Sequence, residues 1–248
     1  MLPFARRRSR VVLAIVAVAI VAGSLGMWLR SSSLVRVKDV TVSGIDGNQA
    51  ADIRDALTVA ALDMTTLAVD EDELRAAVEK YPVVRNLRSS IDFPHRLRIA
   101  VNAYDAVAAL APERGSLTAV AADGTLLRGT ATRDLPLIGV RTVPGGARVR
   151  DDAALGAVRL LGAAPGPMRR RVMRVFRARR GLAATVHEGP KLYFGGDRRL
   201  RAKWSAAAQV LAHGSSRGAS YVDVRIPERP VAGGFQPRPD VSSPSTLG

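Results

Sequence analysis

One serine lies in a pattern that hydrolases use to present a nucleophile. Residues 214–218 read Gly-Ser-Ser-Arg-Gly and fit the spacing G-x-S-x-G, with Ser216 in the central position. A nucleophile elbow needs a strand before that serine and a helix after it. The surrounding pattern predicts a helix before it and a strand after it. We therefore interpret the segment as the loop that follows a helix.

The remaining reactive residue types show no arrangement that supports catalysis. None of His95, His187 and His213 has another His, Asp or Glu at helical i+4 spacing, and His187 and Glu188 are neighbours that would point to opposite faces of a strand. The absence of cysteine excludes a thiolate nucleophile, a Cys-ligated metal and a disulfide. The glycine pairs at 145–146 and 195–196 lack the pattern of a phosphate loop. We expect no cofactor, no metal and no enzymatic activity.

Positive charge is the strongest compositional signal. The 248-residue chain has a net charge of +15, and seven arginines fall within residues 169–180. Such clusters suit nucleic acid, anionic lipid headgroups or an acidic wall polymer, but alternating arginines on an exposed strand also explain this segment. A GC-rich genome would produce the same overall excess without any such partner. Phe176 is the only aromatic within the segment, so it offers no stacking platform for bases.

The N-terminal region predicts a membrane anchor. Residues 11–29, from Val11 to Leu29, carry no charge, and as a helix they would span roughly 28 Å, close to the hydrocarbon thickness of a bilayer. Trp28 lies where an interfacial aromatic belongs. Ala22-Gly23-Ser24 is a passable signal-peptidase site, but the apolar run continues through Leu29 without a break, which favours an uncleaved anchor.

The charges beside this run predict the topology. Only Arg30 directly follows it, whereas four arginines precede it: Arg6, Arg7, Arg8 and Arg10. The positive-inside rule places residues 1–10 in the cytoplasm and everything after residue 30 outside. Because the rest of the chain is exported, we expect contact with membrane lipid and no nucleic-acid partner.

The first part of the exported region predicts a small α+β unit. Residues 34–43 alternate as a strand with a bulge near Lys38-Asp39, and residues 49–59 have the period of an amphipathic helix. Asp70 can cap a second helix that stops at Pro82. Two further strands, 83–92 and 96–101, are joined by a hairpin at Phe93-Pro94-His95.

The next region predicts a β-rich domain. Asp123-Gly124 marks a hairpin between 117–121 and 125–128, and Pro136 suggests that residues 135–139 form an edge strand or a loop. The remaining elements are expected as follows: a helix at 151–161; a meander at 172–179, 182–187 and 191–194; a helix at 198–212; and a final strand at 220–226. Pro, Gly and Ser dominate the end, so residues 236–248 are expected to be a disordered tail.

This layout resembles the FtsQ/DivIB bacterial cell-division proteins, and the first unit looks like their POTRA domain. The resemblance rests on the order of short phrases, among them Val40-Thr41-Val42-Ser43-Gly44, residues 74–84 (LRAAVEKYPVV), residues 92–99 (DFPHRLRI), Ala122-Asp123-Gly124, Leu135-Pro136, Phe194-Gly195 and residues 221–225 (YVDVR). Two local departures occur, at Asn102-Ala103-Tyr104 and at Val83. The expected organisation is a basic tail at 1–10, a transmembrane helix at 11–29, a POTRA-like domain at 35–103, a β-rich domain at 104–235 and the tail at 236–248.

The resemblance implies a function in division. FtsQ-like proteins bind FtsB/DivIC-type and FtsL-type bitopic partners, which implies a non-catalytic scaffold in the cell membrane at the septum that helps regulate peptidoglycan synthesis. It also implies that residues 221–226 form an exposed edge strand that accepts a partner strand. The implied partner-binding residues are Tyr221, Val222, Val224, Ile226, Glu228 and Phe235, although alternate residues of this strand must also fill the core.

Three other interpretations remain open from the residues alone. A membrane-anchored POTRA-type chaperone would bind unstructured exported polypeptides. A basic binder of wall polymer or lipid would use residues 169–180 and weaken steeply with salt. A secreted enzyme would need a convergent polar pocket, which the sequence does not reveal.

Overall fold

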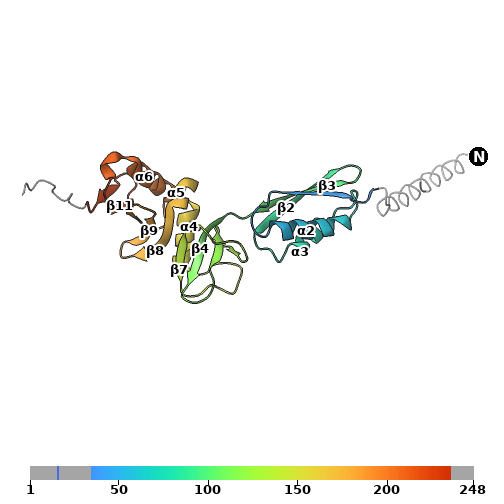
Figure 1. The fold of residues 1–248 in the computed structure, drawn as a ribbon, viewed down its shortest axis with the longest axis horizontal. Helices are drawn as coiled ribbons and strands as arrows, with labels where there is room; N and C mark the ends of the chain where they lie inside the picture. The colour runs from blue at the N-terminus through green and yellow to red at the C-terminus, as the bar shows by residue number, and fades with distance from the viewer. Residues whose placement is uncertain (1–15, 17–34, 236–248) are drawn as a thin grey trace, which may run out of the picture. The chain divides into compact units, whose positions relative to one another are not determined.

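A computed structural model describes Val16 and residues 35–235 (Figure 1). These residues form two compact units, the first ending at Ala103 and the second beginning at Tyr104. Apart from Val16, the predicted anchor with Val11, Trp28 and Leu29 lies outside the described residues, as do residues 1–10 and 236–248. Within the described residues, no helix has the length and apolar character needed to cross a membrane.

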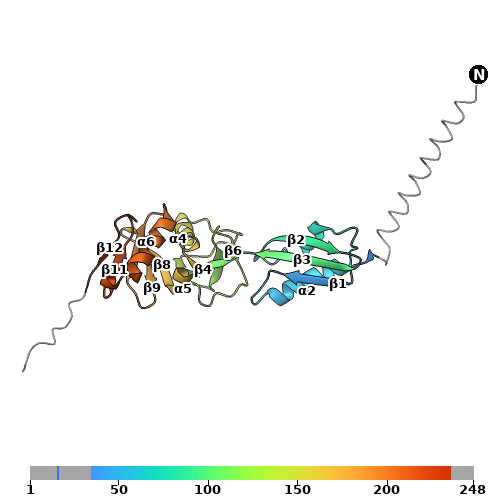
Figure 2. The same cartoon turned by 90° about the horizontal axis from the view of Figure 1, so that it is seen from above.

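The first unit is a three-stranded sheet with two helices. Its elements are β1 (Asp39–Ser43), α2 (Ala50–Leu62), α3 (Glu71–Ala77), β2 (Val84–Asp92) and β3 (Arg96–Ala103). Strand β3 lies in the centre, parallel to β1 and antiparallel to β2, and Figures 1 and 2 show both helices on one side of the sheet. The predicted order of strand, helix, helix, strand and strand is confirmed.

Local sequence signals account for most of this unit. Ile53, Leu57 and Ala61 recur at helical spacing and are fully buried on one face of α2. Asp70 caps α3 by accepting from the backbone N–H groups of Asp72 and Glu73. The expected strand at 34–43 is shorter than predicted, since β1 begins at Asp39. The bulge before it is present, because the N–H groups of Lys38 and Asp39 both donate to the carbonyl of His95.

The second unit contains a nine-stranded mixed sheet. Its elements are β4 (Ala106–Pro112), β5 (Thr118–Ala121), β6 (Leu126–Leu127), β7 (Leu137–Val140), α4 (Asp152–Gly162), α5 (Gly166–Arg171), β8 (Val172–Ala178), β9 (Gly181–Val186), β10 (Lys191–Gly195), α6 (Leu200–Ala212), β11 (Tyr221–Asp223) and β12 (Val231–Gly233). The strand order is β12-β11-β10-β9-β8-β7-β4-β5-β6. Side chains of α4 and α6 pack on one face of this sheet and form the main core with it.

Three features of the second unit differ from the sequence prediction. β7 is an interior strand, parallel to both β4 and β8, and is neither an edge strand nor a loop. Pro136 lies just before β7, so its missing N–H removes no hydrogen bond from within the strand. Its carbonyl accepts from the N–H of Ala109. Strands β4 and β12 and helix α5 were not predicted at all. The arginine-rich segment is therefore part helix and part strand.

Candidate partner-binding site

The C-terminal edge of the large sheet is formed by β12, and not by residues 221–226 as the sequence analysis predicted. Strand β11 ends at Asp223 and lies between β10 and β12, parallel to the first and antiparallel to the second (Figure 2). A turn closed by the Arg229 N–H and the Ile226 carbonyl reverses the chain. The chain therefore returns to cover the edge that β11 would otherwise expose.

The hydrogen-bond phase identifies which backbone groups of β12 face outward. Lys191 N–H donates to the Ser220 carbonyl and Val224 N–H donates to the Tyr193 carbonyl, so Val222 between them also bonds to β10, although the Ser220 N–H itself donates to the Gly233 carbonyl of β12. Tyr221 and Asp223 therefore face β12, where their partners in register are Gly233 and Val231. By alternation, the N–H and C=O of Ala232 point away from the sheet. Ala232 is the outward-facing residue at the centre of this edge.

The structure divides the predicted contact residues into two groups. Val222 and Val224 are completely buried in the main core, so their side chains hold the strand in place and are not exposed to a partner. Tyr221 is half-buried: its ring stands edge-on to Tyr193 at 6.0 Å and lies over Gly233, where a Cβ would come within 2.5 Å of the Tyr221 hydroxyl. Glycine at 233 therefore makes room for this tyrosine.

Apolar side chains beside the edge remain open to solvent. Ile226 is 61% exposed, Val231 is 54% exposed and Phe235 is 51% exposed. All three occur within residues 226–235, which include the turn, β12 and the two residues that follow β12. Exposed apolar residues next to unpaired backbone groups are what a strand-adding partner requires, since pairing gives affinity and side chains give specificity.

Glu228 does not stand free beside this edge. Its carboxylate pairs with the guanidinium of Arg199, the residue before helix α6. The hydrogen bond and charge of Arg199 hold the pKa of Glu228 below its ordinary value, and the pKa of Arg199 is raised by the same contact. Both side chains are exposed, so the pair is a weak tie between the turn and α6.

A second carboxylate organises the start of the turn. Asp223 accepts from the Arg225 backbone N–H at 3.1 Å and from its guanidinium Nε at 2.9 Å, with Arg180 Nη1 at 4.0 Å. Partial burial acts to raise the pKa of Asp223, but the bonds from Arg225 and the charges of Arg225 and Arg180 outweigh it, and the pKa lies below its ordinary value.

This arrangement predicts a pH dependence of stability. Folding lowers the pKa of Asp223, so the ionised carboxylate stabilises the folded state. This stabilisation is fully present above the unfolded-state pKa of about 3.9, and it is lost as the pH falls through the lower pKa of the folded state. Replacing Asp223 with Asn is expected to lower the free energy of unfolding by about 1 kcal/mol at pH 7, a modest loss because Arg225 is half exposed. The free energy of unfolding of this variant should also fall less steeply as the pH is lowered. Urea unfolding of the full chain from pH 7 to pH 2 measures both effects. The exposed carboxylate Asp46, changed to Asn, is the control, and equal acid slopes for wild type and Asp223→Asn would contradict the prediction.

Two residues of α6 hold this helix against β10, the strand that pairs with β11 on the side away from β12. The Lys203 side chain is buried and its ammonium donates to the carbonyls of Phe194 and Gly196, each at 2.8 Å. Desolvation lowers the pKa of Lys203. Trp204 is fully buried, packs at a tilt of 50° against Phe194 with ring centroids 4.5 Å apart, and donates from Nε1 to the Leu160 carbonyl at 2.8 Å. These contacts connect α6 to β10 and α4.

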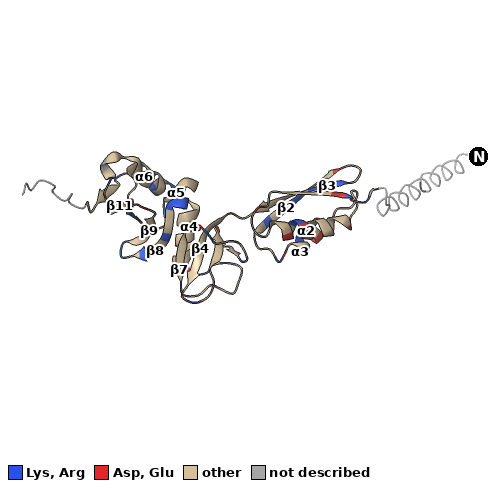
Figure 3. Ribbon diagram, viewed as in Figure 1, with Lys and Arg blue, Asp and Glu red and all other residues tan. Residues whose placement is uncertain are grey.

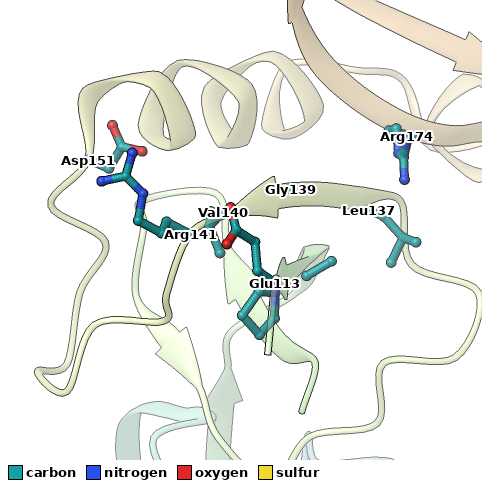
Figure 4. Close-up of a pocket in the computed structure, with 9 residues that line it drawn as sticks. Glu113, Leu137, Gly139, Val140, Arg141, Asp151 and Arg174 are labelled. Carbon is teal, nitrogen blue, oxygen red and sulfur yellow. The ribbon is translucent and has the colours of Figure 1, made fainter. Parts of the chain in front are cut away.

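A hollow of about 780 Å³ lies elsewhere in the second unit, beside β7 (Figure 4). Figure 4 shows Arg141 extended toward Asp151, with Glu113 just after the end of β4 and Arg174 well apart on the far side. Asp151 already caps α4 by accepting from the Ala153 N–H. These charges are spread around the rim and do not converge on one point. In the described part of the chain, no group of three His, Asp or Glu side chains could hold a metal ion.

The arginine-rich segment is mostly solvent-facing. Basic residues gather on α5 and β8 (Figure 3), and within the described residues two of the arginines form ion pairs: Arg169 with Asp105 at 2.8 Å and Arg180 with Asp223 at 4.0 Å. Arg170 and Arg171 lie on α5, so the prediction of a single exposed strand is wrong for the first part of the segment. The segment contributes to the candidate site only through Arg180.

The G-x-S-x-G segment is the end of a helix. Ser216 lies in a 3₁₀ turn after α6 and its hydroxyl donates to the Val210 carbonyl at 2.5 Å and the His213 carbonyl at 2.8 Å. A helix precedes it and β11 follows, which is opposite to a nucleophile elbow. The interpretation as a loop after a helix is confirmed.

Comparison with known families bears on the first unit. A model described as the POTRA domain, FtsQ-type, matches residues 35–104, which covers less than half of the chain. Residues 35–104 are an FtsQ-type POTRA domain. The match agrees with the strand and helix order found above and is consistent with the FtsQ/DivIB family. No curated protein matches the chain.

The residue at the centre of the β12 edge was not among the residues predicted from the sequence. Val231 and Ala232 lie in a three-residue strand that follows Pro230 and ends at Gly233, and proline and glycine on both sides are typical of a loop. One signal could have revealed it: Val231 and Ala232 form a short apolar pair after a proline-containing turn. A strand this short has too few residues for alternation to be detected.

Proposed function

We propose that this chain is a non-catalytic, single-pass scaffold of the bacterial division complex, which binds FtsB/DivIC-type and FtsL-type partners at the septum and helps regulate septal peptidoglycan synthesis. The FtsQ-type POTRA domain supports the division context. The observation that carries the proposed binding site is the outer edge of β12, which no other strand among residues 35–235 covers, with the outward backbone groups of Ala232 beside the exposed Val231 and Phe235. In this proposal the partner adds an antiparallel or parallel strand to β12.

The edge formed by β12 is short, and a short edge suits a partner whose binding is regulated. A three-residue strand offers few unpaired backbone groups, so it resists pairing with other copies of the chain. Specificity must then come from side chains next to the edge. We assign this role to Tyr221, Ile226 and Phe235, and we assign to Glu228 the role of holding the turn through Arg199. The anchor at residues 11–29 would keep this surface outside the membrane.

The proposal is tested by locating an N-terminally tagged full chain in dividing cells. It predicts fluorescence at the septum, and loss of the FtsB/DivIC-type partner from the septum when the chain is depleted. Uniform membrane fluorescence in cells that divide normally without the chain would refute it. Binding of many unfolded exported polypeptides by the purified chain, with no preference for the FtsB/DivIC-type partner, would favour the anchored chaperone instead.

A further inference from the structure

The hairpin between β2 and β3 presents an apolar tip that the proposed function does not use. Phe93, at the tip, is 62% exposed, and Ile91, at the end of β2, is 44% exposed. In the core of this unit, by contrast, β3 buries Leu97 and Ile99 completely. An aromatic and a branched aliphatic side chain left in solvent on one turn indicate a surface that is covered in the working protein.

The tip is fixed beside the point at which the chain enters the first unit. The buried hydroxyl of Thr66 is shared between the carbonyls of Val35 and Pro94, each at 3.1 Å, and its N–H donates to Val35 at 2.7 Å. His95 Nδ1 lies 3.1 Å from the Arg36 carbonyl. The entering chain and the hairpin tip are therefore parts of one hydrogen-bonded cluster, and Figure 1 shows the loop between β2 and β3 at the end of the unit where the described chain begins.

This location constrains how far the tip can be from a membrane. The uncharged run ends at Leu29, and only residues 30–34 separate it from Val35. Even a fully extended chain of this length reaches only roughly 20 Å. If residues 11–29 span the bilayer, as the proposed function requires, Thr66 holds Phe93 at the end of the domain that is tethered to the membrane surface.

The charges around the tip favour an anionic surface. Arg96 pairs with Asp39 at 2.8 Å, and Arg98 pairs with Asp92 at 2.6 Å, so these four charges balance. Arg36 and Lys38 remain, and within the described residues neither forms an ion pair with a carboxylate. Val37 between them is buried, whereas the side chains of Arg36 and Lys38 are both exposed to solvent.

We infer that the β2–β3 hairpin tip is a membrane-contact site, at which Phe93 and Ile91 enter the interfacial region of the bilayer while Arg36 and Lys38 bind anionic lipid headgroups. An aromatic ring at headgroup depth and cations above it are the chemistry of an interfacial anchor. Each cation near an anionic leaflet contributes roughly five-fold to binding. The inference rests on the membrane anchor in the proposed function, and it does not depend on the β12 edge.

The test uses the full chain reconstituted into vesicles of phosphatidylcholine, with or without phosphatidylglycerol. The chain has no cysteine, so an environment-sensitive fluorophore can be attached at one introduced cysteine: Phe93→Cys, Ile91→Cys, or the control Asp46→Cys beyond the other end of β1. The fluorophores at 93 and 91 are expected to emit at shorter wavelength and to be quenched by lipids that carry a quencher near the headgroup. The fluorophore at 46 should report water. Using two tip positions guards against a local effect of either substitution.

A charge comparison separates headgroup binding from simple proximity. The double variant Arg36→Gln/Lys38→Gln should reduce insertion on phosphatidylglycerol vesicles by roughly 25-fold and leave it unchanged on phosphatidylcholine alone. Lys80→Gln/Arg88→Gln removes two exposed cations from elsewhere on the same unit and should have no effect.

Alkaline flotation of the same samples distinguishes the two proposals. A chain that floats with the vesicles while the fluorophores at 93 and 91 report water, as at 46, overturns the inference and leaves the anchor and the division scaffold standing. A chain that does not float overturns both. Protection of position 93 only after an FtsB/DivIC-type partner is added would assign the tip to that protein, and would also overturn the lipid site.

Discussion

Replacing Ala232 with proline is expected to weaken binding of the FtsB/DivIC-type partner by about ten-fold or more. The outward N–H of Ala232 is the central donor of the free edge, and the loss of one backbone hydrogen bond costs about 1–1.5 kcal/mol before the clash of the ring with an added strand is counted. The bonds between β12 and β11 involve Val231 and Gly233, so the edge position tolerates a residue without an N–H.

The matched control is Ala232→Ser, which keeps the N–H and adds only a hydroxyl. Titration of the purified full chain in detergent with the FtsB/DivIC-type exported region would measure both variants. The thermal unfolding midpoint must stay near that of wild type for the comparison to hold. If Ala232→Pro folds and binds as well as Ala232→Ser does, the partner does not add a strand at β12, and the exposed side chains of Ile226 and Phe235 would have to carry the contact alone.

Replacing Trp204 with alanine is expected to lower the unfolding free energy of the second unit by about 3–5 kcal/mol. The side chain is fully buried between α6 and the sheet, so truncation removes a large apolar volume and leaves a cavity. It also leaves the Leu160 carbonyl without the indole donor. A loss of this size is a large fraction of the stability of an ordinary domain.

Trp204→Phe separates packing from hydrogen bonding, because it keeps a ring against Phe194 and removes only the Nε1–H donor. Its expected cost is about 1–3 kcal/mol, the range for an unsatisfied buried acceptor. Amide hydrogen exchange of β9 and β10 in the full chain reports the second unit without relying on tryptophan fluorescence. Exchange rates in Trp204→Ala that match those of wild type would show that α6 is not needed to hold the sheet.

The proposed contact edge and the proposed membrane-contact tip belong to different units of the chain. The tip is fixed to the entering chain by Thr66 in the first unit, whereas β12 and its turn belong to the second unit. Loss of one contact therefore should not remove the other. A variant that lacks lipid contact at Phe93 should still bind its partner through β12.

Local patterns in the sequence determined the first unit almost completely. Helical spacing in α2, alternation in β3 and the Asp70 cap are each set by residues that are close along the chain, so periodicity and capping chemistry predict them. The uncharged run at 11–29 and its flanking arginines likewise predict an anchor from neighbouring residues alone.

Only the tertiary structure decided which strand stands at each edge. The interior position of β7 and the outer position of β12 depend on hydrogen bonds between segments far apart along the chain, and no local periodicity encodes such pairing. The same holds for the Arg199–Glu228 pair and for the hydrogen bonds of Thr66, whose partners are up to 31 residues away. Residue types and spacings set the elements. Pairing across the fold, through burial and backbone hydrogen bonds, set the surface that a partner can reach.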